Sequence, residues 1–225
     1  MTEWWTYRPS DFLLFSARTY RRLFELVNAD AWPVQLVALT LGLLLVAALW
    51  QRREGAQRAA CLVLGAAWLH VAWAFHWQRF AAINWAATWF AVAFVVQGLL
   101  WWAGAASQRP ASLPPGPCQR AGAALLLVAL CGPPALGLLL GRPLAQVEVF
   151  GIAPDPTVLG SLAVLLAAPG GRALPSWLLW PIPLLWCAVS GLMLATMQSP
   201  EAWLLPLAAA LALAGTVLGS DGTRG

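Results

Sequence analysis

Long uncharged apolar stretches recur along this chain. Five of them run for about 19 to 22 residues without an acidic or basic side chain. A helix of roughly 20 residues is about 30 Å long, which matches the hydrocarbon thickness of a bilayer. The sequence therefore predicts an all-α, polytopic transmembrane helical bundle. The five stretches are Trp32 to Trp50, Ala59 to Trp77, Ala81 to Trp102, Ala121 to Leu140 and Trp177 to Met197.

The composition also favours a lipid environment. Hydrophobic residues make up 60% of the chain and charged residues 10%, against about 25% charged residues in ordinary soluble domains. The net charge of +4 comes from arginines that are spread over short predicted loops. We interpret these arginines as determinants of membrane topology. We therefore expect the lipid bilayer as the main partner and no binding of nucleic acid.

Two further segments complete a prediction of about seven spans, Phe150 to Ala168 and Ala202 to Gly219. In the first, only Thr157 to Ala168 is cleanly apolar, and its roughly 12 residues cover only about 18 Å. Six spans plus a re-entrant half-helix is therefore the alternative. Ahead of the first span, Ser10 to Asn28 mixes apolar and charged residues at helical spacing. We expect this segment to be an amphipathic helix in the membrane interface.

We expect a single membrane domain over residues 1–225. Its predicted parts are the interfacial segment 1–30, three spans in 31–102, a Pro-rich cytoplasmic loop at 103–120, the remaining spans in 121–219 and a tail at 220–225. The loop contains the run Ser112 to Pro117, whose prolines cannot continue a helix. Glu25 and Glu148 each stand eight residues before a proline at the start of a span. This spacing raises the hypothesis of a parallel internal repeat.

The distribution of arginine predicts the orientation, because short cytoplasmic loops carry an excess of it. The four arginines ahead of the first span are balanced by four acidic residues. With seven spans we expect the N-terminus outside and the C-terminus in the cytoplasm, whereas six spans would put the C-terminus on the other face. The outside loops then hold Arg79 and Arg142, and the inside ones Arg52, Arg53, Arg58, Arg109, Arg120, Arg172 and Arg224.

Polar side chains within the apolar spans are the first candidates for function, because burying them in lipid is costly. His70 lies near the middle of the second span and Asn84 near the start of the third. Gln35 and Gln97 are amides within the first and third spans. Each fits either a structural hydrogen bond between helices or a position facing a solute. We take all four as candidate substrate-binding residues.

The segment Phe150 to Thr157 supplies two more candidates. Asp155 can cap a helix that Pro156 opens, and the positive N-terminal end of this helix would point toward the outer loop. Asp155 and Thr157 would then line the mouth of a substrate site. The alternative is a rigid turn that only starts a short helix.

The end of the second span carries His76 and Arg79, which we expect to reach lipid headgroups at the interface. His76 lies six residues from His70, so the two cannot form the i, i+4 pair of a helical metal site. The four cysteines show no CxxC or Cys/His spacing. We therefore expect no metal and no cofactor.

Three segments of the chain, Tyr7 to Ser16, Trp77 to Trp85 and Phe150 to Thr157, are similar to those of a known family. They resemble a family of uncharacterised bacterial integral-membrane proteins, catalogued as a domain of unknown function and loosely called permease-like. The resemblance covers nearly the whole chain and implies a bacterial inner-membrane protein. It implies no substrate and no catalytic residue.

The sequence thus favours a small-solute permease, because about seven spans and isolated polar groups within them are what such carriers need. The alternative is a structural or accessory subunit that binds another membrane protein or a second copy of itself. We expect no enzyme, because acid–base catalysis needs paired groups and no two carboxylates share a predicted span.

Overall fold

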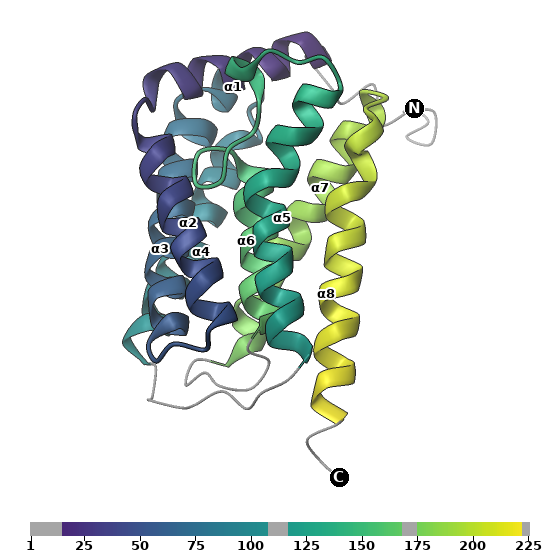
Figure 1. The fold of residues 1–225 in the computed structure, drawn as a ribbon. Coiled ribbons are helices and arrows are strands. Elements are labelled where there is room, and N and C mark those ends of the chain that lie inside the picture. The colour runs from purple at the N-terminus through teal and green to yellow at the C-terminus, as the bar shows by residue number, and fades with distance from the viewer. Residues whose placement is uncertain (1–14, 108–116, 168–174, 222–225) are drawn as a thin grey trace, which may run out of the picture.

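All helices but the first run along one common axis, and the first lies across one end of the others (Figure 1). The computed structural model describes residues 15–107, 117–167 and 175–221, and within these ranges it contains no strand. The predicted all-α class is therefore confirmed. The helices are α1 (Ala17–Asp30), α2 (Val34–Trp50), α3 (Ala56–His70), α4 (Ala87–Ala106), α5 (Pro117–Leu139), α6 (Pro154–Ala167), α7 (Pro181–Thr196) and α8 (Leu204–Asp221).

Several of these helices are long and apolar enough to cross a membrane. Four segments meet this condition among the described residues, namely Ala56–Ala82, Ala87–Ala106, Pro117–Leu139 and Pro200–Leu218. Helices α1 and α2 meet it only together, and the chain bends by 92° between them. Helices α6 and α7 are apolar but shorter. Length and composition thus give four or five candidate spans, fewer than the seven predicted.

The outer surface of the bundle is rich in large apolar side chains. Helix α2 is apolar all round, yet it buries only one side against its neighbours. Leu44 on α2 and Leu211 on α8 are more than half exposed, and Trp89 on α4 is 68% exposed. In a soluble protein such side chains would be covered, since apolar patches of this extent mark contact with lipid or another protein.

Helix α6 forms the centre of the bundle. All of its 14 residues are buried, and it packs against α3, α5, α7 and α8. The packing on α5 is tight at Gly122, where an added Cβ would lie 2.5 Å from the carbonyl oxygen of Ala163. The short fifth predicted span therefore contains a 14-residue helix that other helices surround.

The predicted interfacial helix forms as α1, but its apolar face is covered by protein. Tyr20 and Phe24 pack edge-on against each other and contact the ring of Phe75, with centroid distances of 6.2 and 5.2 Å. The N-cap is Ser16, whose hydroxyl accepts a hydrogen bond from the Thr19 N–H at 3.2 Å. The apolar face of α1 therefore packs on an aromatic surface that the ends of the long helices offer, and the interfacial position of this helix stays a prediction.

Some predicted boundaries differ from the observed ones. The third span begins at Ala87 instead of Ala81, because the 3₁₀ turn η4 (Phe80–Ala82) precedes it. The described parts of the predicted loop 103–120 are mostly helical, and residues 108–116, with most of the Pro-rich run, lie outside the described ranges. Helix α8 continues to Asp221, so the predicted tail starts later, and residues 222–225 also lie outside those ranges.

The connections gather at the two ends of the bundle (Figure 1). The α2–α3 turn, with Arg52 and Arg53, and the start of α5 lie at the end opposite α1. The α3–α4 connection and the α5–α6 connection, which carry Arg79 and Arg142, lie on the same side as α1. Arg52 and Arg53 thus lie at the opposite end of the bundle from Arg79 and Arg142. Positions 109, 172 and 224 are outside the described residues.

Candidate functional site

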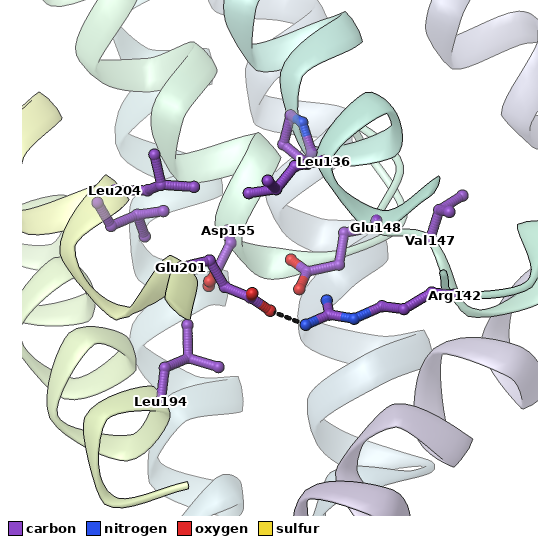
Figure 2. A pocket seen from close by; sticks show the side chains of 11 residues that line it. Leu136, Arg142, Val147, Glu148, Asp155, Leu194, Glu201 and Leu204 are labelled. Atoms are coloured by element: carbon purple, nitrogen blue, oxygen red, sulfur yellow. Dashed lines mark hydrogen bonds and ion pairs between the residues drawn. The ribbon is translucent and has the colours of Figure 1, made fainter. Parts of the chain in front are cut away.

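Four ionisable side chains meet at the end of the bundle that α1 covers. Arg142 and Glu148 belong to the α5–α6 connection, Asp155 to the first turn of α6, and Glu201 to the 3₁₀ turn η7 (Pro200–Trp203) before α8. Figure 2 shows their charged groups turned toward one space. These four residues line a cavity of about 40 Å³. We call them the carboxylate cluster.

The local backbone explains why Arg142 and Glu148 point inward. Helix α5 ends at Leu139, and Gly141 follows with a φ of 72°, the left-handed value that favours glycine just after a helix C-terminus. The short turn η5 (Leu144–Gln146) follows. The Asn28 amide of α1 donates hydrogen bonds to the carbonyl oxygens of Ala145 and Val147, both at 2.9 Å. Helix α1 therefore fixes the connection that carries the cluster.

Arg142 and Glu201 form a buried ion pair across the cavity. The guanidinium Nη2 donates to Glu201 Oε1, and the two side chains are 13% and 8% exposed. Buried charges need such partners, because removing them from water costs several kcal/mol. The pair joins the α5–α6 connection to the start of α8.

Asp155 is held by two side chains of α7. Its Oδ1 accepts a hydrogen bond from the indole N–H of Trp186 at 2.8 Å, and its Oδ2 accepts one from the Ser190 hydroxyl at 2.7 Å. It also lies in the first turn of α6, where the helix dipole stabilises a negative charge. Asp155 has no cation beside it, but two hydrogen bonds and the helix dipole partly compensate the negative charge of its carboxylate.

Glu148 has the least compensation in the cluster. Its buried Oε2 has no hydrogen-bond partner among the described residues. Burial, and then the neighbouring carboxylates of Asp155 and Glu201, raise the pKa of Glu148 well above its ordinary value, while Arg142 acts in the opposite direction. Glu201 Oε2 and Arg142 Nε are likewise without partners within the described ranges. A cavity of this size accepts water molecules, which these atoms can bind.

A second, smaller cavity lies between the cluster and α1. Its volume is about 20 Å³, and it shares Arg142, Glu148 and Glu201 with the first. Its other wall includes Tyr20 and Arg21 of α1. The space beneath α1 therefore borders the cluster. Within the described residues, no group of three or more His, Cys, Asp or Glu side chains has the geometry to hold a metal ion.

Of the predicted substrate-binding residues, only Asp155 belongs to the cluster. Thr157, one turn into α6, is fully buried. Its hydroxyl donates to the Ala153 carbonyl oxygen at 2.8 Å and accepts from the Gly151 N–H at 2.9 Å. Thr157 thus stabilises the turn before α6, as the rigid-turn alternative predicts.

Gln35 and Gln97, two of the predicted substrate-binding residues, connect segments of the fold through their side-chain amides. The Gln35 amide donates to the Asn28 carbonyl oxygen at 2.6 Å and so braces the bend between α1 and α2. The Gln97 amide, fully buried on α4, donates to the Leu179 carbonyl oxygen at 3.2 Å just before α7. In both residues, Oε1 has no partner among the described residues. Neither residue lines the cluster.

Asn84 and Arg79 lie at the α1 end of the bundle. The Asn84 Oδ1 accepts a hydrogen bond from the Ala86 N–H at 3.1 Å, so Asn84 belongs to the turn before α4 and not to the helix itself. Arg79, predicted to reach headgroups, forms an ion pair with Asp30 at the end of α1. The Arg79 side chain is 33% exposed. Both residues have a local partner within the protein.

The two histidines differ in burial, and His76 is the more deeply buried of the two. His70 is half-buried, whereas His76 is fully buried among aromatic rings, with centroids 4.3 Å from Phe94 and 4.9 Å from Trp186. The His76 side chain therefore faces the protein interior and does not reach out toward headgroups, where the sequence predicts it. The reason is the π-helical stretch η3 (Val71–Trp77), which needs more residues per turn and so turns His76 inward.

Sequence patterns do not single out Arg142, Glu148 or Glu201 as site residues, because each falls in a predicted loop. No two carboxylates share a predicted span, but the fold brings Glu148, Asp155 and Glu201 together from separate segments. The predicted seven-span path does, however, indicate that these residues can meet. It places the connections that hold Arg142, Glu148 and Glu201 on one side of the bundle, next to Asp155.

Comparison with known proteins gives one match. The model of a family described as a family of unknown function (DUF6064) matches residues 17–221. No curated protein and no solved structure matches the chain.

Proposed function

We propose, on the premise that the chain belongs to the DUF6064 family, that it is a membrane-embedded permease for a small solute. The observation that carries this proposal is the carboxylate cluster, in which four ionisable groups from two connections and the first turn of α6 meet at one end of an apolar bundle. Ionisable groups inside membrane helices are costly and usually mark pathways for ions or solutes. The proposal assigns no enzymatic activity.

The exposed apolar perimeter supports a location in the bilayer. We infer that α2 to α8 all cross it, including α6 and α7, which are shorter than the other candidate spans. Helix α6 does not need to reach from one lipid surface to the other, because its neighbours cover all 14 of its residues. We propose that the protein lies in the inner membrane of a bacterium. The α1 end then faces outward, as the distribution of arginines in the loops favours.

The arrangement of α6 supports a role for the cluster in transport. Carriers often place substrate or ion sites at the N-terminus of a short or broken helix near the bundle centre. Asp155 and Glu148 lie at such a helix end, and α1 covers the entrance. The cavity of about 40 Å³ holds a few water molecules. We therefore propose that this structure is the occluded conformation and that movement of α1 admits the solute.

Transport by purified protein in lipid vesicles tests this proposal. The excess of carboxylates favours small cations, so the probes are ammonium, methylammonium and guanidinium, with an amino acid and a monosaccharide for comparison. We expect uptake of at least one probe by wild type and a loss of at least tenfold in Asp155→Asn. The matched control, Glu54→Gln, changes an exposed carboxylate in the α2–α3 turn, at the end of the bundle opposite α1. Absence of uptake for all five probes would contradict the permease proposal.

The alternative function is that of an accessory subunit. It is favoured by the tightly packed core, because the cavities of the site are about 40 and 20 Å³, smaller than an organic solute needs. Outward-facing tryptophans such as Trp85 and Trp203 are suited to contacts with another membrane protein. Mild-detergent purification from native membranes distinguishes the two functions. An accessory subunit would be recovered with a stoichiometric partner and would show no uptake alone.

A further inference from the structure

The charges of the carboxylate cluster do not balance. Three carboxyl groups face a single guanidinium in the cavity, and the described residues offer no metal-binding group. Leaving an unpaired charge in a buried site costs far more than neutralising it with a proton. One of the three carboxyl groups is therefore the natural position for a bound proton.

The contacts identify which carboxyl group this is. Glu201 is paired with Arg142, and Asp155 accepts hydrogen bonds from two α7 side chains. Glu148 has neither a cation of its own nor a donor to its buried Oε2. Its neutral form is therefore the least costly of the three.

A second observation indicates an acceptor for this proton. The Glu201 side chain is 8% exposed and lines the same cavity, and its buried Oε2 has no partner among the described residues. Both Glu148 and Glu201 also line the smaller cavity beneath α1. A protonated Glu148 would supply the missing donor on this side of the cavity, directly or through water.

We propose that Glu148 is a proton-binding site and that the proton exchanges with the outside through the space beneath α1. When Glu148 releases the proton, the O–H bond breaks, the electron pair stays on the carboxylate oxygen and the proton passes to water in that space. The new carboxylate then competes with Glu201 for Arg142. If the protein is the permease proposed above, the movement of this proton is coupled to the movement of the solute.

The neighbouring groups decide how the site responds to pH. Arg142 and Glu201 face Glu148 from the α5–α6 connection and from η7, Asp155 faces it from α6, and Tyr20 and Arg21 border the shared space from α1. Deprotonation adds a negative charge beside two existing carboxylates, so it is opposed until the pH is well above the ordinary range of glutamate, near about 4.3.

Infrared difference spectroscopy of purified protein in lipid tests the site without any transport assay. We expect a protonated-carboxyl band that persists at about pH 7, above the ordinary range for glutamate. The band should disappear in Glu148→Gln and remain in the control Glu54→Gln, which changes an exposed residue of the α2–α3 turn. Glu148→Asp, which keeps the carboxyl group, should shift the band and so covers the case in which Glu148→Gln does not fold.

Two results would overturn the proton site. One is a band that survives in Glu148→Gln and is lost in Asp155→Asn. The other is the absence of any protonated carboxyl at about pH 7, where an ordinary glutamate is ionised.

The coupling of the proton to solute movement is tested separately in vesicles, with the probe that wild type transports. An imposed proton gradient should raise uptake at least fivefold in wild type and leave it unchanged in Glu148→Gln. Equal stimulation in both would refute coupling while leaving the permease proposal intact.

Discussion

Arg142 and Glu201 form a buried ion pair between two segments that lie 59 residues apart in the chain. Arg142 follows α5, and Glu201 lies in the turn that leads into α8. The pair thus fastens the C-terminal helix to the connection that carries Glu148. Since desolvation offsets much of the attraction in such a pair, its removal matters mainly through the charge left behind.

Replacing Arg142 alone should therefore be strongly destabilising. Arg142→Met leaves Glu201 buried without a cation, and we expect a loss of about 3–5 kcal/mol in the free energy of unfolding. Replacing both partners, as Arg142→Met with Glu201→Met, should recover most of this loss. Thermal unfolding in detergent measures both effects. The exposed pair Arg22–Glu25 on α1 is the control, and Arg22→Met should change the midpoint little. Equal shifts for the two single variants would contradict the buried pair.

Gly122 should tolerate no side chain, because α5 approaches the backbone of α6 there. An added Cβ would meet the Ala163 carbonyl oxygen at 2.5 Å and the Ala167 N at 2.7 Å. We expect Gly122→Ala to lower the free energy of unfolding by about 1–3 kcal/mol through overpacking. Gly104→Ala on α4 is the matched control, since its Cβ would meet only the Cys61 Sγ at 3.7 Å. That variant should be neutral or more stable by about 0.5–1 kcal/mol.

Ser161 should contribute to stability through one buried hydrogen bond. Its hydroxyl accepts the indole N–H of Trp68 at 2.7 Å and so joins α6 to α3. Ser161→Ala leaves this N–H without a partner, and we expect a cost of about 1–3 kcal/mol. Thr216→Ala removes an exposed hydroxyl of α8 and should stay within about 0.5 kcal/mol. Unfolding midpoints that fall equally in both variants would argue against the interhelical bond.

The raised pKa of Glu148 predicts a specific pH dependence of stability. Between the ordinary glutamate value of about 4.3 and the raised value, the folded state binds more protons than the unfolded state. The free energy of unfolding therefore falls as the pH rises through this window. In Glu148→Gln this contribution is absent, so we expect a flatter dependence than in wild type or in Glu54→Gln. Thermal midpoints in detergent across this range provide the measurement, and identical slopes in all three proteins would contradict a raised pKa.

The existence of the helices could be predicted from the sequence, but some of their boundaries could not. Uncharged runs of about 20 residues have few stable alternatives to a helix, because their backbone groups must bond internally in lipid. The turn at Phe80–Ala82 is as apolar as the helix that follows, so hydropathy alone does not separate them. The outcome for α1 is similar. Its pattern shows that one face is apolar, but only packing decides that Phe75, and not lipid, covers Phe24.

The candidate site could be predicted only in part. Asp155 is visible from its position before a proline in an apolar segment. Glu148 and Glu201 look like loop residues, since their burial depends on contacts between distant segments, such as that with Arg142. The inward position of His76 depends on a π-helical turn that hydrophobic periodicity does not reveal. Long-range packing and local departures from α-helical geometry thus account for what the sequence patterns miss.

Labelling of Cys131 tests directly whether lipid surrounds the bundle. This thiol is exposed on α5, whereas Cys61 and Cys187 are buried. In a Cys118→Ser background in membrane vesicles, we expect an uncharged, lipid-soluble maleimide to label Cys131 and a charged thiol reagent to leave it unmodified. A cysteine introduced as Glu54→Cys, in the exposed α2–α3 turn, should react with the charged reagent once the vesicles are opened. Labelling of Cys131 by the charged reagent at the same rate would contradict the lipid-facing perimeter.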